Sequence, residues 1–460
     1  MKIFTAKRVI ALFWLGSVIA LGVLSLQEEP AAWDAHVYWT AIKAVHRGGD
    51  PYAEGIAAQT SFHNLPYKDP HIHPPMTYVY SPITLPVLRV LGKIPGTLLG
   101  TGYFLALLGC FALQLWAGWQ MARKEERRWL PFLLPAVCFF PGLLNEDVIL
   151  SGNVAYVLHG LVLAAAVPGW RRNRWGWFYA AVLAASICKA PLLTLLAFPV
   201  ILGRRQWLPT AAVGTAGLAL FAAQIKLWPV LFAEYLTAVR LQFDWNKDFG
   251  FGPGGLLGES LVEAGLPYQV PTELLYLGFA LVIALTLLWI SRRIRANANE
   301  ETRESWVPVV AVGTVLLNPR IKEYDVAAIT IPMILIGARF IGYLRDLAAG
   351  TQRAGMEDDR RVASALETHR ADAGVHFKRS DLPIALGAGG WFLTANFATS
   401  GGDWKPTELA LLIALFAAGT WTLMAYRRKT AIAFEARELP LREFERQLGV
   451  TTHSVDAGLP

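Results

Sequence analysis

Long blocks of apolar residues, separated by short polar segments, are the feature that most restricts how this chain can fold. The chain has 460 residues, of which 54% are hydrophobic and only 17% are charged. A helix needs about 20 consecutive apolar residues to cross the roughly 30 Å hydrocarbon layer of a bilayer, and several blocks approach this length. The blocks lack the alternating pattern of a transmembrane β-barrel. The sequence therefore predicts an all-α polytopic membrane protein.

We expect about twelve transmembrane helices. The first apolar block follows three basic residues, as in a signal peptide, but no small-residue cleavage site follows it, so we assign it as the first helix. The two helices that flank Lys189 are short, and are either tilted or do not cross completely. The expected helices cover residues 8–26, 97–120, 129–145, 152–168, 176–188, 190–203, 207–226, 272–290, 305–317, 325–343, 381–398 and 407–426.

The positions of the basic residues predict the topology. With the N-terminus inside, every short inside loop is basic, as the positive-inside rule requires. The net charge of +7 is therefore a topology signal and not a sign of nucleic-acid binding. We expect a bacterial inner (plasma) membrane protein with both termini in the cytoplasm and its site facing the periplasm or cell exterior. Arg339 falls within the expected helix 325–343. The basic inside segments include 123–128, 171–174, 204–205, 292–303 and 345–379.

Two expected outer loops are longer than the topology requires. Such loops are uncommon unless they bind or cover something. In the first, 27–96, residues 33–47 have helical spacing and predict a short interfacial helix. The second, 227–271, contains the Gly-rich stretch FGFGPGGLLGES, which we interpret as a mobile candidate lid. The expected units are a transmembrane core (1–345), a mostly disordered cytoplasmic connector (346–380), two C-terminal transmembrane helices (381–426) and a cytoplasmic tail (427–460).

Asp34 is the first candidate for a chemical role. It lies a few residues after the first apolar block, so its carboxyl group should sit at the mouth of the cavity that the helices enclose. Ionisable groups at the membrane are costly and are often functional. The alternative is that Asp34 only caps the interfacial helix. Asp50, in GGDPY, is better explained as a turn residue, because Asp-Pro after Gly is ordinary turn chemistry.

Several short motifs follow one another in an order that is typical of one family. They are an Asp, a Tyr and GGDPY in the first loop, the YVYSP entry into the next helix, SGNVAYVLHG, CKAPLLTLLAFPVILGRRQW and NPRIKEYD. In this order of motifs, the chain resembles the polyprenyl-phosphate-mannose-dependent α-1,2-mannosyltransferase family, which belongs to the GT-C membrane glycosyltransferases. This family was formerly classified as a domain of unknown function. The similarity extends from about residue 10 to about residue 345.

This resemblance implies a GT-C fold in the core and a hexosyltransferase activity. The donor would be a polyprenyl-phosphate-linked hexose, mannose in the family, and the acceptor an extracytoplasmic glycan or glycolipid. An acidic residue of the first outer loop would act as general base, which is Asp34 here. Where relatives often have a turn with Trp, His or Tyr, this chain has RIKEY at 320–324. Mannose, another hexose and arabinofuranose therefore all remain open as the donor sugar.

The residue types also fit this chemistry directly. Inverting transfer from a lipid phosphate needs one carboxylate base and cations that stabilise the leaving phosphate. Lys189, Arg320 and Lys322 lie on outer turns of otherwise apolar helices and are our candidates for binding the phosphate. Lys189 has the alternative of snorkelling to the interface. Tyr324 either hydrogen-bonds the same phosphate or belongs to the interfacial aromatic belt.

The first loop also supplies candidates for substrate binding. Trp33, Tyr78 and Tyr80 can stack on sugar rings, although Trp and Tyr at a membrane interface need no ligand. For His71 and His73 we favour substrate hydrogen bonding or loop packing over metal binding, because an HxH pair alone is a weak metal signal.

We expect no cofactor and no resident metal. A divalent ion held by Glu146 and Asp147 is the less favoured alternative. No Gly-rich phosphate loop of a nucleotide-sugar enzyme is visible. The expected partners are the lipid-linked donor, the glycan acceptor and the bilayer, without nucleic acid. A transporter or flippase for a polyprenyl-linked glycan is the main rival, and it predicts repeats and charges deep within the spans. A non-catalytic scaffold is a third interpretation.

Overall fold

The computed structural model describes residues 33–65, 75–124, 126–128, 130, 151–296, 300–354 and 405–425. Every regular element in these ranges is a helix. The expected helices 8–26 and 381–398, and 129–145 apart from Leu130, lie outside the described residues.

The other nine expected helices coincide with helical segments of the structure. Five of these segments, α5, α8, α11, α14 and Lys405–Ala425, are long and apolar enough to cross a membrane. The architecture is therefore that of an all-α, multi-pass membrane protein. The helices of the bundle are α5 (Gly96–Met121), η2 (Glu126–Arg128), α8 (Val154–Arg172), α9 (Gly176–Cys188), η3 (Ala190–Leu196), α10 (Ala197–Leu202), α11 (Trp207–Leu227), α14 (Gln269–Ala296), α15 (Glu300–Leu316), α16 (Glu323–Ala327) and α17 (Thr330–Ala354).

Two of the expected spans are broken in the structure. The segment 190–203 consists of η3 followed by α10, and the segment 325–343 is divided between α16 and α17. Helix α17 then continues to Ala354, so the first part of the expected connector 346–380 is helical. The rest of that connector lies outside the described residues.

The main core lies where α8, α9, α10, α14 and α15 meet, and it includes Trp170, Phe178 and Trp306. The outward faces of the long helices are apolar as well: Leu105, Leu218 and Leu281 are about 60% exposed. Exposed apolar patches of this extent are unusual on soluble proteins and suit contact with lipid.

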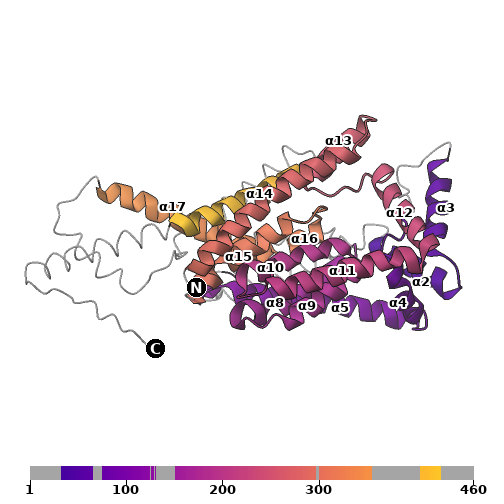
Figure 1. Cartoon of the computed structure of the whole chain (residues 1–460), viewed down its shortest axis with the longest axis horizontal. Coiled ribbons are helices and arrows are strands. Elements are labelled where there is room, and N and C mark those ends of the chain that lie inside the picture. Colours follow the sequence, from indigo (N-terminus) through magenta and orange to yellow (C-terminus); the bar gives the residue numbers. More distant parts are fainter. Residues whose placement is uncertain are drawn as a thin grey trace, which may run out of the picture.

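The first loop forms a small helical layer at one end of the bundle (Figure 1). It comprises α2 (Trp33–His46), α3 (Pro51–His63), η1 (Pro82–Thr84) and α4 (Leu85–Leu91). Helix α2 confirms the helix predicted at 33–47. Helix α3 was not predicted. Its N-cap is Asp50, whose carboxylate accepts hydrogen bonds from the backbone N–H groups of Tyr52 and Ala53 at 2.8 and 3.3 Å. Asp50 is therefore a helix cap, with Pro51 at the favoured first helical position.

The second long loop is also largely helical, with α12 (Pro229–Asp244) and α13 (Pro253–Glu263). Close packing explains its glycines. A Cβ on Gly250, whose φ is +77°, would lie 2.4 Å from the carbonyl oxygen of Ile321, and one on Gly254 would lie 2.7 Å from that of Thr272. The backbone N–H of Phe251 donates to the Ile321 carbonyl at 3.0 Å. The stretch expected to be a mobile lid is thus packed against α14 and the turn 317–322.

The opposite end of the bundle carries basic side chains that bind helix ends. Arg171 donates to the Gln120 carbonyl at 3.4 Å and Arg295 to the Val200 carbonyl at 3.0 Å. Arg339 is 4% exposed and lies there too; its guanidinium binds both carboxylate oxygens of Glu126, at 2.7 and 3.0 Å. Since ions are buried at low cost only when paired, Glu126 accounts for the arginine that the sequence places within an expected span.

Candidate functional site

A cavity of about 580 Å³ lies at the end of the bundle that carries the first-loop helices. Its wall combines segments that are far apart in the chain: α2, residues 76–81, the turn between α9 and η3, α12, the start of α14, and the residues around Arg320. The polar residues of the wall include Asp34, Tyr38, Thr77, Tyr80, Ser81, Asn153, Lys189, Tyr235, Arg240, Gln242, Asp248, Tyr268, Gln269, Thr272, Glu273, Tyr276, Arg320 and Tyr324.

Asp34 lies in the first turn of α2, where the backbone N–H groups of Asp34 and Ala35 donate to the Ser151 carbonyl at 3.0 and 3.2 Å. Its carboxylate accepts a hydrogen bond from the Asn153 amide at 2.9 Å. Burial raises the pKa of Asp34 above its ordinary value, and the bond from Asn153 only partly offsets this shift. The carboxylate is consequently a stronger base than an exposed one.

The turn before α8 positions this carboxylate. Asn153 is the N-cap of α8: its side-chain oxygen accepts from the Ala155 N–H at 2.8 Å while its amide nitrogen binds Asp34. Gly152 has a φ of +64°, and a Cβ there would lie 3.0 Å from the Cβ of Ala35. Only glycine suits that position without strain. The motif SGNVAYVLHG therefore supplies the residue that holds Asp34.

The aromatic candidates of the first loop separate into two groups. Tyr80 is in the cavity wall, and its hydroxyl binds the hydroxyl of Tyr38 at 2.8 Å, which in turn accepts from the Val154 N–H at 3.1 Å. Tyr78 is buried, binds Thr84 at 2.8 Å and belongs to the packing of the loop itself. Trp33 is half-buried on α2 and does not belong to the wall either. His71 and His73 lie outside the described residues.

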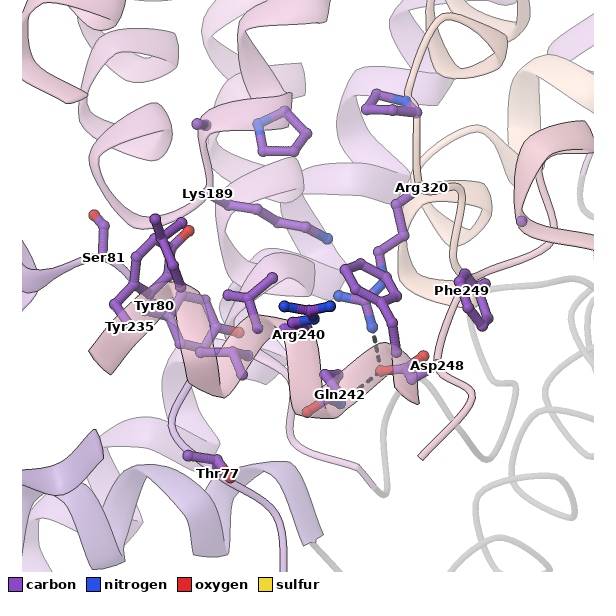
Figure 2. Close-up of a pocket in the computed structure, with 18 of the residues that line it drawn as sticks. Thr77, Tyr80, Ser81, Lys189, Tyr235, Arg240, Gln242, Asp248, Phe249 and Arg320 are labelled. Carbon is purple, nitrogen blue, oxygen red and sulfur yellow. Dashed lines mark hydrogen bonds and ion pairs between the residues drawn. The ribbon is translucent and has the colours of Figure 1, made fainter. Parts of the chain in front are cut away.

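Lys189 is the residue between α9 and η3, and its ammonium group faces the cavity (Figure 2). It lies 3.9 Å from a carboxylate oxygen of Asp325 and 4.1 Å from the centre of the Tyr324 ring. Its Nζ is buried and has no hydrogen-bond acceptor among the described residues. Burial lowers the pKa of Lys189 to about 8, more than Asp325 raises it. This ammonium group therefore has three free N–H donors at the cavity.

Arg320 and Lys322 share one carboxylate. The Arg320 guanidinium and the Lys322 ammonium each form an ion pair with a different oxygen of Asp248. Figure 2 shows Arg320 pointing into the same region as Lys189, with Asp248 and Gln242 next to it. The Nε of Arg320 has no hydrogen-bond partner in the described part of the chain. Lys322 is not in the cavity wall itself.

Sequence reasoning missed Asp248. It lies between α12 and α13, just before the Gly-rich stretch. Burial alone would raise the pKa of Asp248, but Arg320 and Lys322 outweigh that effect and hold the pKa of this carboxyl well below its usual range. Its pairing with Arg320, 72 positions further along the chain, has no signal in local sequence pattern.

A second carboxylate missed from the sequence, Asp325, lies behind the cavity. It is 0% exposed, and its oxygens bind His159 at 2.5 Å, the Asn318 amide at 3.0 Å and the backbone N–H of Lys322 at 2.9 Å. These bonds join α8 to the turn NPRIKEYD. The motifs SGNVAYVLHG and NPRIKEYD thus meet at Asp325.

The described residues contain no group of three or more His, Cys, Asp and Glu arranged to hold a metal ion. Glu146 and Asp147 lie outside the described part of the chain.

Comparison of the chain with protein-family models, with curated proteins and with solved structures gives no match. The assignment of a function therefore depends on the chemistry of the cavity.

Proposed function

We propose that this protein is a membrane glycosyltransferase that moves a hexose, mannose by family resemblance, from a polyprenyl-phosphate donor to a glycan or glycolipid acceptor. One observation carries this proposal: a carboxylate with a raised pKa and a buried ammonium group without an acceptor share one cavity at the end of an apolar helical bundle. A base and an anion site in one place are the two elements that transfer from a lipid phosphate requires.

In this mechanism, Asp34 takes the proton of the acceptor hydroxyl as that oxygen attacks the anomeric carbon. The bond between the anomeric carbon and the phosphate oxygen breaks, and its electron pair leaves with the phosphate. Lys189 and Arg320 bind the departing oxygens without transferring a proton. Attack opposite the leaving group inverts the anomeric centre.

Asp34 suits the role of base better than Asp248. Its pKa is raised by burial, whereas that of Asp248 is lowered by two cations. A carboxylate that is already bound to an arginine and a lysine has little affinity for a further proton. Burial thus favours Asp34 as the base, whereas Arg320 and Lys322 keep Asp248 ionised as their counterion.

The distribution of charge supports the orientation that we propose. The basic residues that bind helix ends lie at one end of the bundle and the cavity at the other. Under the positive-inside rule, the cavity then faces the periplasm or cell exterior, where lipid-linked sugars are used. The finer assignment, a GT-C fold with about twelve transmembrane helices, is part of this proposal.

The proposal is tested with the full-length protein in lipid nanodiscs, a short-chain polyprenyl-phosphate mannose and a panel of alkyl glycoside acceptors. We expect release of the polyprenyl phosphate and formation of a new glycoside. Asp34→Asn should lower the rate by about 10²–10⁴-fold, the usual contribution of a general base. Asp50→Asn is the matched control, because Asn caps a helix as well as Asp does.

Turnover by Asp34→Asn at the rate of the unchanged protein would remove Asp34 as the base. Translocation of intact donor across a proteoliposome, without cleavage, would instead support the flippase. Absence of both activities with every lipid donor would leave only the membrane architecture.

A further inference from the structure

The cavity contains a carboxylate that is placed where an anionic ligand would bind. Asp248 directs one oxygen to the Arg320 guanidinium (Figure 2) and the other to the Lys322 ammonium group. Phosphate oxygens prefer the same two partners. Asp248 therefore occupies the position that suits two oxygens of a phosphate monoester.

Asp248 differs from Asp325, another acid close to these cations. Asp325 is 0% exposed, is held by three hydrogen bonds and lies outside the cavity wall. Asp248 lines the cavity, its side chain is 22% exposed, and it lies on the non-helical segment between α12 and α13. Apart from its two cations, its carboxylate receives a hydrogen bond from Gln242 at 2.7 Å. One acid is fixed, and the other can move without breaking a helix.

The cavity also holds donors that Asp248 does not use. The Nζ of Lys189 and the Nε of Arg320 are buried and without hydrogen-bond partners among the described residues. The polyprenyl phosphate that the reaction releases has three free oxygens, one more than a carboxylate; in the donor, one of these three is bonded to the anomeric carbon of the sugar. The phosphate can contact the donors that Asp248 binds and the ammonium group of Lys189 as well.

We propose that Asp248 is a displaceable internal counterion: it neutralises Arg320 and Lys322 while the cavity is empty, gives way to the phosphate of the lipid donor, and pairs with them again as the lipid phosphate leaves. This inference rests on the proposed function, since it specifies how the same phosphate site is kept filled between turnovers. Without such a competitor, Arg320 and Lys322 would lack a counterion and, together with Lys189, would bind the phosphate product tightly and slow its release.

The test measures binding of farnesyl phosphate, a short polyprenyl monophosphate, to the purified full-length protein in detergent. Asp248→Asn removes the internal anion and should bind farnesyl phosphate at least about tenfold more tightly. Asp244→Asn is the matched control: Asp244 is the last residue of α12, four positions before Asp248, and its carboxylate binds Tyr268 at 2.7 Å and Arg240 at 3.5 Å. It should bind as the unchanged protein does.

Two further variants keep the result interpretable. Gln242→Leu keeps Asp248 but removes the hydrogen bond that directs it, so it should tighten binding by a smaller factor even if Asp248→Asn does not fold. Lys189→Gln should weaken binding, because it removes the free ammonium group. Inorganic phosphate, measured in parallel, separates recognition of the phosphate from recognition of the lipid, and should bind more weakly than farnesyl phosphate.

The outcomes separate the two proposals. One outcome would disprove the counterion alone: farnesyl phosphate binds Asp248→Asn and Gln242→Leu no more tightly than the unchanged protein, but binds Lys189→Gln more weakly. Asp248 would then only support the two cations, and the phosphate site would stand. Equal binding in all variants, or none in the unchanged protein, would overturn the phosphate site together with the counterion.

Discussion

Burial favours the neutral form of both the Asp34 carboxyl group and the Lys189 ammonium group. Burial raises the pKa of the Asp34 carboxyl group and lowers that of the Lys189 ammonium group to about 8, because a medium of low polarity disfavours both charges. The proposed reaction needs the charged form of each. The proposed reaction is therefore fastest at pH values between the pKa of Asp34 and the pKa of Lys189, where both groups are charged.

This leads to a bell-shaped pH dependence of kcat/KM for the lipid donor. Below the raised pKa of Asp34 the base is protonated and the rate falls; above about pH 8 Lys189 loses its proton and the rate falls again. Lys189→Arg should move the alkaline decline upward, since a guanidinium stays charged. The measurement is kcat/KM from pH 5 to about 10. An alkaline decline that stays in place in Lys189→Arg would assign it to another group.

At the level of single residues, the sequence predicted five members of the cavity wall but not their partners. Asp34, Tyr80, Lys189, Arg320 and Tyr324 were all chosen from residue type and position, and all line the cavity. An acid or a cation on the outer turn of an apolar helix is conspicuous because it is costly there. The pairing of each charge depends on tertiary contacts, which leave no periodic signal.

At the level of elements, the turn 317–322 is shaped by the segment that precedes α13. Gly250 contacts the Ile321 carbonyl so closely that no Cβ fits, and the N–H of Phe251 donates to the same carbonyl at 3.0 Å. The glycine-rich composition suggested mobility, because sequence alone does not show that a backbone approaches closely. The sequence predicted one helix over 325–343 because the apolar run continues through the break between α16 and α17.

Gly250→Ala should therefore impair the site through the backbone. A residue with a Cβ at a φ of +77° is strained by roughly 1–3 kcal/mol, and the methyl group would displace Ile321 and with it Arg320. We expect kcat/KM to fall about 10- to 100-fold, the usual effect of a small misplacement of a binding group. Gly278→Ala, where no atom lies within 4 Å of the added Cβ, should leave it unchanged. Equal kinetics in both variants would disprove the role of this contact.

At the level of the whole molecule, the buried Arg339–Glu126 ion pair and the proposed chemistry lie at opposite ends of the bundle. Arg339 and Glu126 tie α17 to the segment after α5, and Arg339 also donates to the Ser305 carbonyl at 2.8 Å. The apolar blocks predicted the bundle well because a bilayer tolerates few alternatives. They did not predict this ion pair, whose members are 213 positions apart.

Glu126→Gln should destabilise the fold without altering the site. It leaves the buried Arg339 charge without its counterion, which costs about 3–5 kcal/mol. We expect a clearly lower thermal unfolding temperature in detergent, with farnesyl phosphate affinity unchanged at low temperature. Glu54→Gln, which removes the exposed Arg47–Glu54 pair, should change the unfolding temperature little. A large effect of Glu126→Gln on the affinity would mean that the two ends are coupled.

The side chain of Asn153 caps the N-terminus of α8 and also donates a hydrogen bond to Asp34, the proposed base, on α2. The orientation of the Asp34 carboxylate therefore depends on the position of α8. If the tilt of α8 changes, Asn153 moves with the helix and the hydrogen-bonded Asp34 carboxylate is reoriented. Bilayer thickness and lateral pressure, which set how such a helix leans, would then act on proton removal at a distance, through one side chain.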